Sequence, residues 1–345
     1  MKNTPPKLRS RMITFFLIAA LSNAVIAGSP RLCDEASEID NYDTDFLDNF
    51  ITLKEGEESW LFRNTDLKTE FGPGKRGYQR LHYLNKLLKQ HGTQLMIVPI
   101  PTRGIIETNQ LGDIAYDTKQ GQQAYENYLV SLRKIGIAVP KLENLYKKIH
   151  NKPLFFARDH HWTSYGAKEV AKLTARKIKQ QDFYKDTSKQ EFETNKVGQL
   201  VMVGSHQKAA EEICKIQYEN EMIDEYTTEN ISELDLFGDI AEPEVVLVGT
   251  SNSNAKLNFN FSGYLMQYSK LDILNLAKSG GGYDGAILDY LKSEDFKANP
   301  PKLLIWEIPS YYSLNSKSFY KKMVRLLKQN DRNNNKKKSM EVVSR

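Results

Sequence analysis

Short apolar runs and segments with helical periodicity alternate along most of the chain. Continuous apolar runs, which are typical of buried parallel strands, occupy residues 94–100, 244–249, 302–308 and, more weakly, 271–276. Between them, residues 78–91 and 125–135 repeat apolar side chains at helical spacing. Strands that alternate with helices predict an α/β fold with a central, mainly parallel sheet.

Two regions depart from this pattern. Residues 181–243 are polar, rich in Glu and Lys, and show no clear strand pattern, which predicts a helical insertion rather than a second domain. Residues 321–345 carry nine basic and two acidic side chains. The Asn/Lys run at 331–338 cannot build a core, so we expect a basic, disordered tail.

The first 27 residues have the order of features found in a secretory signal peptide. Four basic side chains precede an apolar run that ends in the small residue Ala27. Ser22 and Asn23 interrupt the run, which is short for a membrane span. A cleaved signal peptide over 1–27 is therefore predicted, with an uncleaved anchor helix as the alternative. The folded body is expected over residues 28–320.

Charge and glycine patterns exclude several kinds of partner. The whole-chain net charge of +5 includes +4 from the signal segment and +7 from residues 321–345, which leaves the body near −6. The body has no cluster of basic and aromatic residues typical of a nucleic-acid interface. The glycines near 72–75 and 279–282 lack the spacing of phosphate or dinucleotide sites, so no cofactor is predicted.

The chain contains only two cysteines, Cys33 and Cys214. An even pair in an exported protein predicts one disulfide, with two free buried thiols as the alternative. A bond across so long a loop would stabilise the fold by roughly 4 kcal/mol or more.

The run 244–249 ends abruptly in a turn that carries Ser251. Ligands of open α/β sheets bind outside the carboxyl ends of strands, and a serine on such a turn presents its hydroxyl there. Its own backbone N–H would face a developing oxyanion. The segment reads G-x-S-x-S, which differs from the α/β-hydrolase elbow. The alternative is a serine that only caps a helix.

The segment Arg158-Asp-His-His-Trp precedes a helix-like run over 168–179 and holds two of the six histidines. In an extended loop, Asp159 and His161 point the same way, so the carboxylate can orient an imidazole whose other nitrogen faces a nucleophile. His160 would then point elsewhere. A zinc site and a purely structural contact are the alternatives, but the sequence lacks the third and fourth ligands of common zinc motifs.

Three further residues near the predicted carboxyl edge of the sheet are weaker candidates. Arg103 follows the first strand and can bind a carboxylate-bearing substrate, unless it braces the core. Gly281 follows the strand near residue 275 and can supply an oxyanion donor, unless the glycines only form a turn. Tyr312 follows the last strand and either lines the cleft or packs.

Together these segments resemble the SGNH-hydrolase-like domain of the bacterial alginate O-acetyltransferases, the AlgX/AlgJ family. The resemblance covers about residues 33–320. It is carried by residues 60–63 (WLFR), 101–104 (PTRG), 159–163 (DHHWT), 248–253 (VGTSNS), 260–264 (NFSGY), 279–282 (SGGG) and 304–307 (LIWE). It implies a three-layer SGNH-like fold with a polar insertion.

The resemblance also implies roles. Ser251 is the expected nucleophile, His161 the base, Asp159 its orienting acid, and Cys33 and Cys214 the paired cysteines. The expected activity is acetyl transfer in the periplasm to an alginate-like polyuronate, through an acetyl-serine intermediate. The expected acetyl donor is a molecule or a donor protein at the inner membrane. The expected partners are other subunits of a polysaccharide export complex. An acetylesterase of the same fold and a noncatalytic scaffold are the alternatives.

One departure from the family concerns how polymer is held. The AlgX members carry a C-terminal carbohydrate-binding module after this domain, whereas here a basic segment follows Tyr320. Polymer is therefore expected to be held by the catalytic domain, by the Lys and Arg of that segment, or by a partner.

Overall fold

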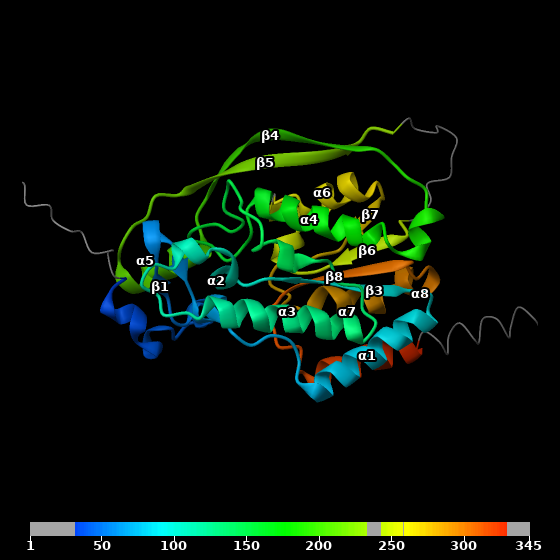
Figure 1. The fold of residues 1–345 in the computed structure, drawn as a ribbon, viewed down its shortest axis with the longest axis horizontal. Coiled ribbons are helices and arrows are strands. Elements are labelled where there is room, and N and C mark those ends of the chain that lie inside the picture. Colours follow the sequence, from blue (N-terminus) through cyan, green and yellow to red (C-terminus); the bar gives the residue numbers. More distant parts are fainter. Residues whose placement is uncertain (1–31, 233–242, 258, 330–345) are drawn as a thin grey trace, which may run out of the picture.

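The computed structural model describes residues 32–232, 243–257 and 259–329 (Figure 1). At its centre lies a four-stranded sheet of order β3-β8-β6-β7 in which every pair of neighbours is parallel. Its strands are β3 (Gln94–Ile100), β6 (Val245–Val248), β7 (Ile273–Asn275) and β8 (Leu303–Pro309). All side chains of β6 and β8 are buried, which explains why both strands are almost entirely apolar. The predicted parallel sheet is confirmed.

Helices cover both faces of this sheet, which makes three layers (Figure 1). On one side lie α4 (Ser164–Ile178) and α6 (Phe261–Ser269). On the other side lie α1 (Lys75–Gln90), α3 (Thr118–Lys134) and α7 (Gly285–Lys292). Shorter elements are α2 (Arg103–Ile106), α8 (Glu294–Ala298) and the strand pair β1 (Lys54–Glu55) and β2 (Leu61–Phe62). The predicted α/β class is confirmed, and the predicted helices correspond to α1, α3 and α4.

The polar insertion differs from the prediction. It contains α5 (Ser205–Cys214) between two long antiparallel strands, β4 (Phe192–Met202) and β5 (Glu221–Asn230). Figure 1 shows this hairpin crossing over α4 and α6. The expectation of no strands was wrong because the hairpin leaves most of its side chains in solvent, so few positions need to be apolar. Residues 233–242 lie outside the described part.

The folded body continues past residue 320, where the basic tail was expected to begin. A helix spans residues 317–329, and its Met323 and Leu327 are fully buried. These apolar side chains recur at helical spacing between basic ones, so the segment has a buried face despite its charge. The rest of the expected tail, 330–345, and the predicted signal peptide, 1–27, lie outside the described residues. Among the described residues, the helices fall short of the length and hydropathy that a membrane span requires.

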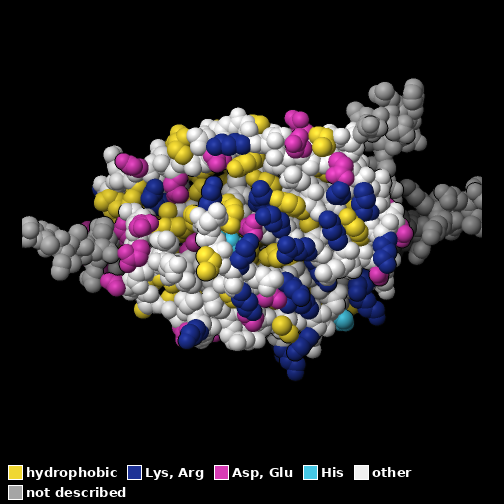
Figure 2. All heavy atoms as spheres, turned by 45° about the horizontal axis from the view of Figure 1, so that its top comes forward, with side chains coloured by type: hydrophobic (Ala, Val, Ile, Leu, Met, Phe, Trp, Pro, Cys, Tyr) yellow, Lys and Arg dark blue, Asp and Glu magenta, His cyan; other side chains and the backbone are white. Residues whose placement is uncertain are grey.

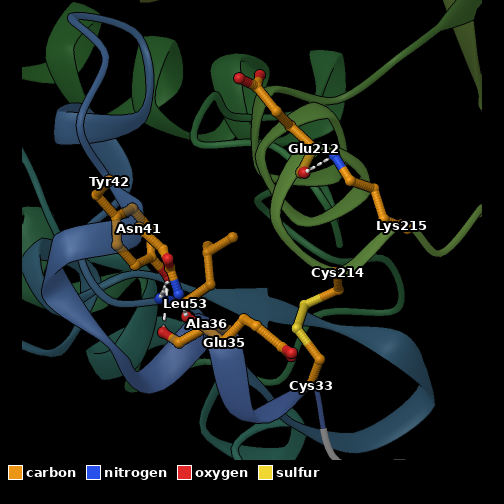
Figure 3. Close-up of a disulfide and its surroundings, with 9 residues drawn as sticks. All are labelled: Cys33, Glu35, Ala36, Asn41, Tyr42, Leu53, Glu212, Cys214 and Lys215. Carbon is orange, nitrogen blue, oxygen red and sulfur yellow. Dashed lines mark hydrogen bonds between the residues drawn. A yellow bond between two sulfur atoms is a disulfide. The ribbon is translucent and has the colours of Figure 1, made fainter.

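The predicted disulfide is confirmed. Cys33 and Cys214 are bonded, with their Cα atoms 5.5 Å apart (Figure 3). Cys214 ends α5, so the bond ties this helix to the N-terminal segment. Apolar side chains of that segment, including Phe50 and Leu53, pack with Ala209 and Ala210 of α5 in a small second core.

Candidate active site

The three predicted catalytic side chains form one hydrogen-bonded chain. Asp159 Oδ1 lies 2.5 Å from His161 Nδ1, and His161 Nε2 lies 2.8 Å from Ser251 Oγ. Asp159 and His161 are buried, whereas Ser251 is half-buried. The arrangement is that of a serine nucleophile, a histidine base and a carboxylate that fixes the imidazole.

Ser251 occupies the turn that directly follows β6. It begins a short 3-10 helix, Ser251–Ser253, at the carboxyl edge of the sheet. The turn passes so close to β8 that a Cβ on Gly249 would lie 2.6 Å from Glu307 Oε2, so only glycine fits there. Thr250 is fixed to the same carboxyl group, to which its N–H donates over 2.8 Å and its hydroxyl over 3.0 Å.

Glu307 is therefore a buried carboxyl group directly beneath the nucleophile turn. It has no exposed surface. Burial raises the pKa of Glu307 to about 7, although the hydrogen bonds from Thr250 and the charge of His161 oppose the rise. The segment 304–307, which carries part of the family resemblance, includes Glu307, but the pattern indicated no role for this residue because a glutamate inside an apolar strand looks like an interruption of the run.

Asp159 lies at the N-terminus of α5. Its Oδ2 accepts a 2.6 Å hydrogen bond from the Ser205 N–H, and its Oδ1 accepts one of 2.8 Å from the His161 N–H. Burial alone would raise the pKa of Asp159, but the charges of the two neighbouring histidines and these hydrogen bonds hold it well below its usual value. The carboxylate therefore stays ionised, and the free N–H groups of a helix start favour that charge.

The loops that carry His161 and Ser251 are fastened to each other. The Trp162 indole N–H donates to the Asn252 backbone oxygen over 2.9 Å. The ring of Phe259 lies 5.1 Å from that of His161. These contacts hold His161 and Ser251 at a fixed separation. In the sequence, the only sign of these contacts is that Trp162 and Asn252 directly follow His161 and Ser251.

His160 does not point away from His161, as the sequence had suggested. The two rings lie 3.9 Å apart, and His160 Nδ1 is 2.7 Å from Ser205 Oγ. The expectation failed because residues 157–161 form turns and bends, not an extended loop. Burial, followed by the charge of His161, lowers the pKa of His160 well below its usual value.

Asp159, His160 and His161 also bring potential metal-ligand atoms within 4.8 Å of one another. The same atoms take part in the hydrogen bonds among the triad and to Ser205. A metal ion would have to displace these bonds, so the geometry favours the hydrogen-bonded triad.

Arg103 is not positioned to meet a substrate. It is buried, with 1% of its surface exposed, and pairs with Asp66 over 3.1 Å. It also donates to the backbone oxygens of Phe156 and Ala157, just before the Asp159 loop. The interpretation of Arg103 as a bracing arginine is the one that the structure supports, since a buried guanidinium needs this many acceptors.

The loop containing Gly281 lies beside the nucleophile turn. Asn254 donates to Ser279 Oγ over 3.2 Å, and the Lys278 N–H donates to the Gly249 oxygen over 3.1 Å. Positive φ angles at Gly280 and Gly282 agree with a turn that needs glycine. An oxyanion donor at Gly281 stays a prediction. So does a cleft-lining role for Tyr312, whose half-buried ring packs against Tyr283.

Comparison with known families agrees with this site. The model for the SGNH hydrolase-like domain of acetyltransferase AlgX matches residues 53–310, which include all three triad residues. The chain belongs to the AlgX family.

Relatives and solved structures support the assignment. Alginate biosynthesis protein AlgX of Pseudomonas aeruginosa is 36% identical over 340 residues, which cover 92% of this chain and 71% of the relative. The structure of P. aeruginosa AlgX matches with a TM-score of 0.80 over 86% of this chain and 70% of that one. AlgX of Pseudomonas syringae pv. tomato is 39% identical over 86% of the chain, which spans only 63% of that relative. The O-acetyltransferase domain of Pseudomonas putida AlgJ, 24% identical with a TM-score of 0.65 over 80% of this chain and 99% of that one, shares the fold.

Proposed function

We propose that the chain is an O-acetyltransferase that carries an acetyl group on Ser251 and delivers it to a hydroxyl of a polysaccharide. The observation that carries the proposal is the unbroken hydrogen-bond chain from Asp159 through His161 to Ser251. Membership of the AlgX family agrees with this activity.

The first half-reaction forms an acetyl-enzyme. Ser251 Oγ attacks the carbonyl carbon of the acetyl donor while His161 Nε2 takes the hydroxyl proton. Asp159 holds the Nδ1–H side of the ring and stabilises the imidazolium. The tetrahedral oxyanion is stabilised by the Ser251 backbone N–H, which as the first of its helix has no intrahelical partner. His161 then gives the proton to the departing donor group, and the acetyl ester of Ser251 remains.

The second half-reaction repeats these steps with a sugar hydroxyl. His161 takes the proton of the acceptor hydroxyl, whose oxygen attacks the acetyl carbon, and returns a proton to Ser251 Oγ as the new ester leaves. We propose a polyuronate acceptor like alginate, because relatives are named alginate biosynthesis protein AlgX and probable alginate O-acetylase AlgJ. The same proposal includes export to the periplasm, a donor protein at the inner membrane and further subunits of an export complex.

An acetylesterase is the second candidate, since water can take the place of the sugar hydroxyl at the same acetyl-enzyme. Turnover of a chromogenic acetyl ester with and without mannuronate oligomers separates the two. Acetylated oligomer at the expense of free acetate supports transfer, whereas products that ignore the oligomer support hydrolysis.

The acetyl-enzyme itself is the decisive test. Intact-mass and peptide analysis after brief exposure to an activated acetyl ester should show a gain of about 42 Da, one acetyl group, on the Ser251 peptide. The adduct should be absent in Ser251→Ala and His161→Ala. It should persist in Ser253→Ala, a matched change two residues away. A wild-type protein that never carries the adduct would instead support a noncatalytic scaffold.

A further inference from the structure

Three depressions follow helix α4 from its N-terminus to its C-terminus. Their volumes are about 350, 400 and 450 Å³. The first lies between α4 and strand β5, and the other two lie between α4 and residues 133–150. We call the surface formed by these three depressions the α4 groove.

The α4 groove is strongly basic. Nine Lys and Arg side chains line it, against two acidic ones, Glu169 and Asp224. Figure 2 shows Lys and Arg gathered across this face of the molecule. The body as a whole carries about six more acidic than basic side chains. The groove therefore concentrates positive charge on an otherwise acidic protein, which focuses the field on anionic ligands.

Part of this charge is not neutralised within the fold. Among the described residues, Lys152, Lys168 and Arg176 have no ion-pair partner. Four other basic side chains of the groove pair with carboxylates, namely Arg133, Lys147, Lys148 and Lys172. Lys168, Lys172 and Arg176 recur every four residues, so they form one stripe along α4. Such a row of like charges disfavours the isolated helix, and a polymer with regularly spaced anions would compensate it.

Aromatic rings accompany the basic row, so the expectation that the body has no cluster of basic and aromatic residues was wrong: the fold brings together residues that are far apart in the sequence. Lys168 Nζ lies over the ring of Tyr264 at 5.8 Å, and Lys172 Nζ over that of Tyr268 at 5.7 Å. Tyr165 and Tyr226 also line the first depression. Ring faces pack against the C–H faces of sugars, and ammonium groups bind carboxylates. The combination matches a sugar that carries a carboxylate on every unit.

The α4 groove begins beside the triad. Thr163 and Ser164 line its first depression and follow His161 by two and three residues. Phe156, also in that lining, donates its N–H to the His161 backbone oxygen over 3.3 Å. A polymer held along α4 would therefore run away from the reacting hydroxyl over the length of the helix, about 22 Å for fifteen residues.

We propose that the α4 groove is a polymer subsite that binds the carboxylates of a polyuronate acceptor. The proposal rests on the acetyl-transfer function proposed above and adds where and by what chemistry the polymer is held. It places the polymer-binding site on the domain that carries Ser251.

The test measures binding of a labelled polymannuronate oligosaccharide to Ser251→Ala, which binds without turnover. Adding Lys152→Gln, Lys168→Gln and Arg176→Gln should weaken binding at low salt by roughly tenfold or more, and high salt should shrink the difference. The matched control changes Lys75, Lys86 and Lys89 to Gln. These are exposed residues of α1 on the opposite side of the sheet, so the charge change is equal and binding should stay as in the parent. Thermal unfolding checks that both triple variants fold.

Three outcomes would overturn the subsite: equal binding by both triple variants, equal binding of a neutral mannan oligosaccharide, or equal displacement by oligo-dT of the same charge. The last would assign the groove to nucleic acid, which also uses basic and aromatic side chains. Failure of the subsite is distinct from failure of the proposed function. An acetyl adduct on Ser251 without groove-dependent binding would refute the polymer subsite and leave the acetyltransferase proposal intact. Groove-dependent binding without an adduct would refute the acetyltransferase proposal and leave the binding site intact.

Discussion

Replacing Glu307 with Gln should change how the stability of the fold depends on pH. Glu307 is fully buried, and the groups that face it are Thr250, Ser253 and His161. Glutamine has nearly the same size as glutamate and keeps a side-chain oxygen that can accept the hydrogen bond from the Thr250 N–H. Its amide can also donate to the Thr250 hydroxyl, which now donates to the carboxyl group. It cannot ionise, so it reproduces the neutral form of the glutamate.

The magnitude follows from the pKa of Glu307, which is about 7 in the fold against an ordinary 4.5. A carboxyl group whose pKa is higher in the folded protein binds its proton more tightly there. Its contribution is therefore greatest below pH 4.5, declines as the pH rises, and is lost above pH 7. A difference of that size corresponds to roughly 3 kcal/mol in the free energy of unfolding. Glu307→Gln should remove this decline.

Urea unfolding followed by circular dichroism, with the disulfide intact, measures the effect at pH 4, 5, 6, 7 and 8. The stability of Glu307→Gln relative to the parent should rise by roughly 3 kcal/mol between pH 4 and pH 8. Glu193→Gln, an exposed change on β4, controls for the loss of a surface carboxylate. Parallel pH profiles for the parent and Glu307→Gln would refute the reasoning, because Glu307 would then titrate alike in the folded and unfolded chains.

Three further changes test other parts of the structure. Asp159→Asn should lower turnover of an acetyl ester by roughly 10²- to 10⁴-fold with little change in KM, since the imidazole loses its orienting charge; steady-state kinetics that match the parent would contradict that role. Replacing Cys33 and Cys214 with Ser should lower the free energy of unfolding by roughly 3 to 5 kcal/mol in urea titrations, and an unchanged midpoint would show that the closed loop contributes nothing. Arg103→Lys should lower it by roughly 2 kcal/mol or more, because one ammonium cannot reach Asp66 and the backbone oxygens together; a thermal melt equal to that of the parent would argue against the bracing role.

The sheet and the triad were predictable because their signals are local. A strand buried on both faces is apolar at nearly every position, so β3, β6 and β8 stand out from sequence alone. The end of such a strand places Ser251 at the carboxyl edge, where sites form. The two-residue spacing of Asp159 and His161 then suggested a carboxylate and imidazole pair.

Features that depend on distant partners were mispredicted or missed. Arg103 follows a strand at the site edge, and only the fold shows that Asp66 and neighbouring carbonyls surround it. The ring of His160 lies against that of His161 because the loop bends, and no local pattern distinguishes this bend from an extended loop. The β4–β5 hairpin shows no alternation of apolar and polar residues, because most of its side chains remain exposed or half-buried where it crosses over other elements.

The geometry of the triad depends on α5 more than the motifs suggest. The start of α5 holds the Asp159 carboxylate through the Ser205 N–H, and its end is bonded through Cys214 to the N-terminal segment. Gly204, just before α5, lies so near this loop that a Cβ would meet the Arg158 oxygen at 2.0 Å. The insertion that looked like a peripheral addition thus supplies the support for the acid of the triad. The position of the Asp159 carboxylate is therefore set where the insertion meets the Asp159 loop.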